Sequence, residues 1–383
     1  MARGGLIKFK QQPTISKQLS EIASIAGSST NKDDITQNIL IKVADSILVL
    51  KATNYNIELQ TEIPLTDVES EGEITVNANK LKETLSNLDQ NNLVNFNYDE
   101  QNNLLVLSNG STNFEIRTRS SIDFPSFEME EIEHTIVLKQ KQLKSIIDSC
   151  LLCVSNEDFR DYLRGVRFEV NGSKLEIFTS DGHRMAILET QLDNPSTDAE
   201  PFGVILTKRC ASQLAKIVNE EADSDVILSF TKNAVQTSCN NYKMNSKLIN
   251  CGYPNVRTVI PKTIDSIISI PKDTFTNLIK QVSVLSSKRV NGVTFTFGGG
   301  QVTLRSENSE HEVATASLAL PDAQSNIEIS LNAQYVREVL GVIKTDNVLF
   351  CFSQPMIHVL IKPETEVNDL GVKASYIISK VVV

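Results

Sequence analysis

Apolar and polar residues follow one arrangement that recurs six times along the chain. Each copy has a short alternating run, a stretch with apolar residues three and four positions apart, and then further alternating runs. Alternation with a period of two predicts strands, and the three-and-four spacing predicts helices that bury one face. The predicted helices fall within residues 15–27, 79–89, 139–154, 208–221, 272–289 and 332–346.

This repetition also predicts the domain organisation. A chain of 383 residues is too long for one ordinary core, since domains typically have about 100 to 200 residues. Two copies per domain give three tandem α+β domains, each with two helices on one side of antiparallel strands. The expected domains are residues 1–128, 129–262 and 263–383. Three equivalent blocks predict an arc, which becomes a ring only if another chain completes it.

Tight turns separate several of the predicted strands. Asp181-Gly182 lies between two alternating segments and predicts a hairpin whose two central residues both need positive φ. Asn171-Gly172 predicts a second hairpin one strand earlier, so the region is expected to be a meander. Gly298-Gly299-Gly300 lacks the Lys-Ser/Thr that follows a phosphate-binding loop, and a hairpin turn is predicted there as well.

The most distinctive segment is the run TSDGHRMA at residues 179–186. It resembles the segment that bacterial DNA polymerase III sliding clamps (β subunit) carry in their middle domain. The similarity extends over nearly the whole chain and includes residues 50–54, 71–76, 123–125, 163–166 and 253–255.

The resemblance implies a non-catalytic processivity factor of the DNA polymerase III holoenzyme. In that family a head-to-tail homodimer of six domains forms a ring, and its helices line the hole. The ring slides on duplex DNA without reading its sequence. The implied partners are double-stranded DNA, the DNA polymerase III catalytic subunit, the clamp loader and other proteins with clamp-binding motifs. No cofactor is implied.

The resemblance also implies a peptide-binding cleft beside the turn at His183, which receives short segments containing Gln and Leu or Phe. A turn that exposes its backbone beside an apolar floor suits an extended peptide, with backbone and Arg donors fixing its orientation. The positions that match the family's cleft are Leu163, Ser180, Gly182, His183, Arg184, Met185, Pro254, Thr258, Val259, Ile377, Ile378, Ser379 and Val381.

The C-terminus departs from the family pattern. Similar clamps end in Met-Pro-Met-Arg-Leu or close to it, whereas this chain ends in Ser379-Lys380-Val381-Val382-Val383. The loss of both thioethers removes adaptable apolar surface from one wall of the cleft. His358 stands where family members often have a small residue or Pro. Because the tail is altered, an alternative function stays open: a diverged ring scaffold that binds peptides but does not serve chromosomal replication.

For the ring seam, the resemblance pairs an apolar edge of the first domain with the first helix of the third. The matching positions are Phe114 and Ile116 against Val284 and Leu285. A head-to-tail contact made twice closes a two-fold ring. The same residues also suit the core of a single domain, and both interpretations stay open.

Charge separates the helices from the rest of the chain. A net charge of −10 argues against a protein that coats nucleic acid with its whole surface. The six helix windows nevertheless carry 15 Lys and Arg against 9 Asp and Glu. A basic helical lining inside an acidic body suits a sleeve around DNA, although exposed helix faces favour Lys in any case. Tyr162, Lys208 and Arg209 match positions near the family's DNA path, and the helix charges add Lys141, Lys144 and Lys280.

Composition excludes several other classes of protein. Hydrophobic content of 40% and charged content of 22% are typical of a globular protein. No apolar run approaches the length of a membrane span and the start lacks the apolar core of a signal peptide, so a cytoplasmic location is expected. Cys150 and Cys153 lie on a predicted amphipathic helix, where buried packing is favoured over redox or zinc chemistry.

The alternative function is a hydrolase or nuclease-like enzyme that uses Asp181 and His183 as an acid/base pair. Against it, the two residues flank a turn with no recognisable nucleophile or second carboxylate cluster nearby. The other histidines, His134, His311 and His358, show no HxxxH or HxH spacing, so no metal site is expected.

Overall fold

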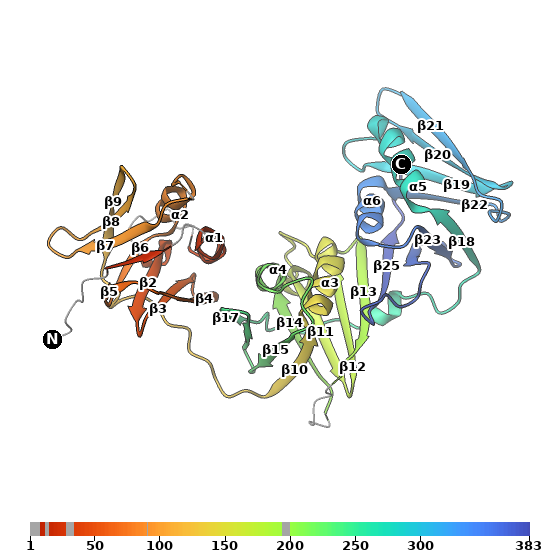
Figure 1. The fold of residues 1–383 in the computed structure, drawn as a ribbon. Helices are drawn as coiled ribbons and strands as arrows, with labels where there is room; N and C mark the ends of the chain where they lie inside the picture. The colour runs from red at the N-terminus through yellow and green to blue at the C-terminus, as the bar shows by residue number, and fades with distance from the viewer. Residues whose placement is uncertain (1–7, 12–14, 28–33, 90, 194–199) are drawn as a thin grey trace. The chain divides into compact units, whose positions relative to one another are not determined.

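The computed structural model describes residues 8–11, 15–27, 34–89, 91–193 and 200–383 (Figure 1). Each α-helix in these ranges begins within one residue of a predicted window, which confirms the six predicted helices. All six end earlier than predicted, and α3 and α5 do so because they pass into the 3₁₀ turns Leu151–Cys153 and Ser283–Leu285. The helices are α1 (Ser16–Ala23), α2 (Ala78–Ser86), α3 (Gln140–Cys150), α4 (Lys208–Ile217), α5 (Lys272–Val282) and α6 (Ala333–Val342).

The chain divides into two compact units. The first comprises Met1–Val137, Lys216–Val218 and Ser224–Leu248. The second comprises Leu138–Ala215, Asn219–Asp223 and Ile249–Val383. No helix in the described ranges is long and apolar enough to cross a membrane.

The first unit is built on one sheet of thirteen strands, although β10 ends two residues into the second unit. In spatial order the strands are β10 (His134–Lys139), β15 (Asp225–Phe230), β16 (Ala234–Cys239), β17 (Tyr242–Lys247), β4 (Ile57–Pro64), β3 (Ile47–Thr53), β2 (Asn38–Ala44), β6 (Gly72–Asn77), β9 (Thr112–Arg119), β8 (Leu104–Asn109), β7 (Val94–Asp99), β1 (Lys8–Gln11) and β5 (Val68–Ser70).

The second unit contains two sheets. The larger has, in spatial order, β14 (Phe202–Thr207), β11 (Gly165–Asn171), β12 (Lys174–Ser180), β13 (Arg184–Gln191), β25 (Lys373–Ser379), β24 (His358–Pro363), β23 (Asn347–Phe352) and β18 (Ser266–Pro271). The smaller has β21 (Val313–Ala319), β20 (Gln301–Glu307), β19 (Gly292–Gly298) and β22 (Ile327–Asn332).

The predicted repeat is present in this order of elements. Each of the six helices follows a strand and is succeeded by further strands. Every strand pair with a described register is antiparallel, including β4 with β17 and β13 with β25. These two pairs join strands from different predicted domains into continuous sheets. The α+β prediction is confirmed, and the sheets run across both predicted boundaries.

Side-chain caps explain where two of the helices begin. The Asn77 side chain accepts a hydrogen bond from the Lys80 backbone N–H at 3.1 Å at the start of α2. Asn332 does the same for Gln334 and Tyr335 at 2.9 and 3.1 Å at the start of α6. Asn at the N-cap satisfies amides that have no partner inside the helix, so both starts are encoded locally.

The core between α5 and the strands of the second unit is aromatic. Phe275 of α5 lies edge-on to Phe350 of β23, with ring centroids 5.6 Å apart, and tilted against Phe295 of β19 at 5.7 Å. Phe350 also contacts Phe297 and Phe352, at 6.4 and 6.5 Å. All five rings are at most 1% exposed, so the cluster fastens α5 to both sheets.

Replacing the central ring of this cluster tests its contribution. Phe350→Ala is expected to lower the free energy of unfolding by about 3–5 kcal/mol, because it removes a fully buried ring and leaves a cavity. Phe159→Ala is the matched control: that ring is 90% exposed, so the change should stay within about 0.5 kcal/mol. Urea unfolding followed by circular dichroism measures both. Equal midpoints for the two variants would contradict the assignment.

Candidate functional site

The turn between β12 and β13 is closed by its own side chains. Asp181 Oδ1 accepts the backbone N–H of His183 at 3.0 Å and of Arg184 at 2.9 Å. Ser180 Oγ accepts from Gly182 N at 3.1 Å and donates to the Arg184 carbonyl at 2.8 Å. Gly182 alone takes a positive φ, +87°. The predicted hairpin is present, but positive φ at Asp181 is wrong, because its carboxylate holds the turn instead.

A row of cross-strand partners, apolar from Met185 onward, crosses four strands beside this turn. Ser180 pairs with Met185, Met185 with Ile377, and Ile377 with Leu360. Cross-strand partners share a face of the sheet, so these side chains lie in line. Met185, Ile377 and Leu360 belong to a buried cluster that also contains Phe178, Val256 and Cys351. Its rim is only partly buried and consists of Ile187, Tyr253, Val259, Ile260 and Leu349.

One side of the cluster is covered by the 3₁₀ helix Val256–Val259. The Arg257 guanidinium fastens it to β11 and β12 through hydrogen bonds of 2.7 Å to both Glu169 and Glu176. The same guanidinium lies 4.8 Å from the ring centre of Phe178. Burial raises the pKa of Glu176, but bonds from Arg257 and Lys174 outweigh it and lower the pKa below its usual value. This carboxylate therefore stays ionised at neutral pH.

The structure brings most of the predicted cleft residues to this region. Met185 and Ile377 belong to the buried cluster, which is the apolar floor of the predicted cleft. Val259 lies on the partly buried rim of this cluster. A Cβ on Gly182 would lie 3.9 Å from Leu163 Cδ1 and 2.9 Å from the Arg160 guanidinium. Pro254, which precedes the 3₁₀ helix, and Thr258, which lies in it, are both exposed.

The C-terminal residues divide between the two faces of the sheet. Ser379 donates its backbone N–H to the His183 carbonyl at 2.9 Å, and Val381 donates to the Ser330 carbonyl of β22 at 2.8 Å. The structure corrects the prediction that Ile378 lines the cleft. Neighbouring residues of a strand point to opposite faces, so Ile378 lies away from the Ile377 side and is fully buried there. It does not line the floor.

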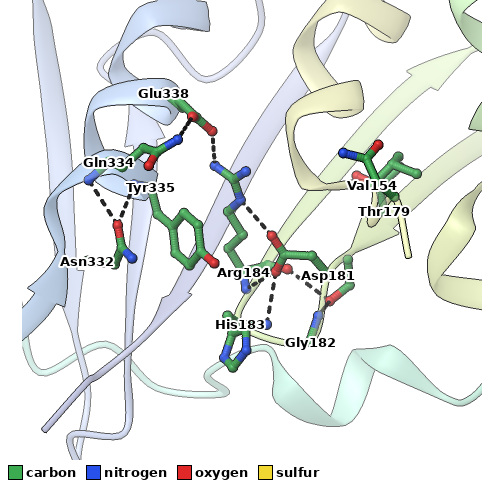
Figure 2. Close-up of polar contacts among 12 residues, drawn as sticks. Val154, Thr179, Asp181, Gly182, His183, Arg184, Asn332, Gln334, Tyr335 and Glu338 are labelled. Carbon is green, nitrogen blue, oxygen red and sulfur yellow. Dashed lines mark hydrogen bonds and ion pairs between the residues drawn. The ribbon is translucent and has the colours of Figure 1, made fainter. Parts of the chain in front are cut away.

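Arg184 joins the turn to α6 (Figure 2). Its Nε donates to Asp181 Oδ2 at 2.9 Å and its Nη1 to Glu338 Oε2 at 2.5 Å. The guanidinium carbon lies 4.3 Å from the ring centre of Tyr335, and the residue is 9% exposed. The predicted role of Arg184 is to bind an incoming peptide. In the structure its Nε and Nη1 are engaged with partners inside the protein.

Sequence reasoning missed the α6 side of the site. Tyr335 stacks on His183 with ring centroids 6.4 Å apart, and Glu338 binds Arg184 (Figure 2). Both come from a helix that begins some 150 residues after the turn. The local signal was the N-cap Asn332, which predicts where α6 starts but not what the helix faces.

Comparison with known families matches three consecutive segments. Residues 10–128 match the N-terminal domain of the DNA polymerase III beta subunit, residues 137–255 its central domain and residues 257–374 its C-terminal domain. The chain belongs to the DNA polymerase III beta subunit family.

Individual relatives agree with this assignment. A "Beta sliding clamp" of Pseudomonas aeruginosa is 28% identical over 319 residues, covering 83% of this chain and 86% of the relative. One of Vibrio cholerae is 25% identical over 346 residues, covering 90% and 93%. The crystal structure of a DnaN sliding clamp from Pseudomonas aeruginosa bound to griselimycin has a TM-score of 0.90 at 25% identity, over 98% of this chain and all of that one.

The family assignment and the geometry of the turn both contradict the hypothesis that the protein is a hydrolase or nuclease-like enzyme. Sliding clamps of this family are non-catalytic processivity factors, and this chain shares that role. The Asp181 carboxylate bonds to the backbone of His183 and not to its ring, which stacks on Tyr335. The two residues do not form an acid/base pair.

The predicted DNA-facing residues differ in exposure and in their contacts with other groups of the protein. Lys280 is exposed on α5. Lys141 pairs with Asp223, Lys144 pairs with Asp148 at 2.5 Å, and Lys208 donates to the Val154 carbonyl at 2.8 Å. Tyr162 lies edge-on to Tyr253 at 5.8 Å, and burial lowers the pKa of Arg209. Two of the lysines are thus locally neutralised.

The buried cysteines are packing residues. Cys150 and Cys153 are fully buried, and desolvation raises the pKa of both thiols. Cys210, Cys239 and Cys351 are buried as well, whereas Cys251 is exposed. Thiolates are the reactive form of cysteine, so the buried thiols should be inert.

Thiol labelling tests this packing. With Ellman's reagent, one thiol per native chain should react quickly, and all six should react after denaturation. Cys251→Ser should abolish the rapid phase and leave the total at five. Rapid labelling of three thiols in the native protein would show that Cys150 and Cys153 are accessible and reactive after all.

Proposed function

We propose that two copies of the chain close head to tail into a ring, which encircles duplex DNA and tethers a DNA polymerase to it. The observation that carries the proposal is the match to a sliding clamp over 98% of the chain at a TM-score of 0.90. On this proposal the three clamp domains are residues 1–128, 129–262 and 263–383. Such a ring works where the DNA is, in the bacterial cytoplasm.

Two free sheet edges support the head-to-tail contact. Residues 112–117 of β9 pair with β8, and β6 pairs only with Thr118 and Arg119 in the described registers. At the edge of the smaller sheet, β21 has β20 as its partner. An unpaired edge is a ready template for a strand of another chain.

The predicted seam residues lie on or beside these edges. Phe114 is half-buried on β9. Ile116, two residues further along the same strand, is 6% exposed. Val284 is 77% exposed in the 3₁₀ turn Ser283–Leu285, which packs against β21 and in which Leu285 is half-buried. At this exposure Val284 is not part of a domain core and is accessible to a partner chain.

The proposed contact with DNA is electrostatic and independent of sequence. The helix windows carry an excess of basic residues, while the chain as a whole has a net charge of −10. Phosphate contacts position a protein on DNA without reading bases. Contact of this kind has Kd values of about 10⁻⁴ to 10⁻⁶ M, so closure of the ring is what retains it.

The proposed docking site for the polymerase, the clamp loader and other partners is the region around His183. Its support is the apolar cluster, whose rim of Val259, Ile260, Ile187 and Leu349 is only partly buried. An extended segment with apolar anchors can cover such a rim and bond to the exposed backbone of the turn. The Met-free tail, which ends in Val381-Val382-Val383, gives this site less adaptable apolar surface than similar clamps have.

The oligomeric state tests the seam. The native protein is expected to have twice its chain mass of 42.4 kDa in size-exclusion chromatography with light scattering. Val284→Asp should shift it to the monomer, because a buried unpaired carboxylate opposes the contact. Ile122→Asp, at a residue that is 82% exposed outside both edges, should leave the dimer intact. A wild-type monomer at micromolar concentration would remove the ring.

Retention on DNA tests the function itself. Incubated with a clamp loader and ATP, the wild-type protein should stay on nicked circular DNA through a high-salt gel filtration and leave when the circle is linearised. Val284→Asp should not be retained on either form. Equal retention on circular and linear DNA would mean that the protein binds DNA directly and does not encircle it.

A further inference from the structure

Arg184 joins the turn to α6 through an ion pair, next to the stacking of His183 on Tyr335. Its three contacts lie within one unit: Asp181 in the turn, the Tyr335 ring on α6, and Glu338 one helical turn further along α6. Figure 2 shows the guanidinium between the two carboxylates, beside the Tyr335 ring. The guanidinium thus lies against the same ring that stacks on His183.

The contact with Asp181 belongs to the turn alone. Asp181 and Arg184 are three residues apart, and the same carboxylate already accepts two backbone N–H groups of the turn. Removing Glu338 would leave these bonds in place. Among the described polar contacts of the Arg184 side chain, only that with Glu338 reaches α6. Glu338 thus affects the link between the elements and not the turn itself.

Glu338 is itself held in place on the helix. Its Oε1 accepts a hydrogen bond from Gln334 Nε2 at 2.8 Å, one helical turn earlier. Tyr335 and Glu338 are three residues apart and lie on the same helix face, where both are half-buried. Burial raises the pKa of Glu338, but bonds from Gln334 and Arg184 outweigh it and lower the pKa below its usual value. The carboxylate is therefore ionised at neutral pH.

We propose that Glu338 is a positioning residue of the docking site: by holding Arg184, it fixes the Tyr335 ring against His183, so that α6 and the turn form one wall for the partner segment. This inference rests on the docking site proposed above. Glu338 does not need to touch the partner. The side chain is 37% exposed, so the ion pair contributes little to stability, and its effect is on geometry.

A single-tryptophan reporter tests the wall without any partner. The chain has no Trp, so Tyr335→Trp introduces one emitter beside Arg184 and His183. Glu338→Gln in this background is expected to shift the emission and lower its anisotropy, because the indole loses its fixed neighbour. Glu338→Asp should restore part of the signal. The matched control is Glu328→Gln. Glu328 lies in β22, the strand before α6, and its carboxylate accepts a hydrogen bond from Thr296, so this change should leave the emission unaltered.

Affinity for a partner segment is measured on the same variants, without the reporter. The probe is a fluorescein-labelled peptide that contains Gln-Leu-Ser-Leu-Phe. Glu338→Gln should raise its Kd by about two- to fivefold, the range of a partly exposed charge pair, with an unchanged unfolding midpoint. Glu328→Gln should leave the Kd unchanged.

The two measurements separate the two proposals. If the peptide binds wild type and Glu338→Gln equally, the positioning role is overturned while the docking site stands. If the peptide does not bind wild type but the emission of the Tyr335→Trp reporter responds to Glu338→Gln, the link between the turn and α6 stands and the docking site fails. An emission that ignores Glu338→Gln overturns the inference whatever the peptide does.

Discussion

The antiparallel pairing of β13 with β25 is the constraint on which the site depends. Six residue pairs, from Arg184↔Ile378 to Glu189↔Lys373, join segments that lie about 190 residues apart in the sequence. Each backbone bond contributes only about 0.5–1.5 kcal/mol net, so the bonds alone do not choose the register. Packing does: β25 is buried on both faces, and a slip by one residue would move the Tyr376 ring, which is 1% exposed, to the face that Ile377 occupies. The ladder thereby places the turn, the apolar row and the C-terminal tail together.

The same ladder explains why the altered C-terminus can keep its place. The tail is held by backbone groups: Ser379 bonds to His183, Lys380 to the Ile357 carbonyl and Val381 to Ser330. None of these bonds depends on the side chains that differ from the family pattern. What changes is the surface. Ser379 Oγ lies 3.2 Å from His358 Nδ1, so a polar pair ends the apolar row, and burial lowers the pKa of this imidazole.

Features encoded over a few residues could be predicted from the sequence. The helices follow from apolar spacing, and the turn at Gly182 follows from a glycine between alternating runs, because both depend on neighbours. The Arg184 to Glu338 contact spans 154 residues and has no local signature. Matching positions to a family likewise selected Ile378 beside Ile377, although strand alternation alone separates them. The positive φ expected at Asp181 failed because a side-chain acceptor satisfied the turn amides.

Charge counted along the sequence overstates the field that DNA would meet. Lys141 and Lys144 both contribute to the basic excess of the helices, yet Asp223 and Asp148 lie against their ammonium groups. Lys208 is directed to a carbonyl and to Asn156, and burial lowers its pKa. The remaining attraction is weak and screened by salt. For a ring this is an advantage, because a closed ring cannot leave its DNA sideways and strong phosphate contacts would only slow its sliding.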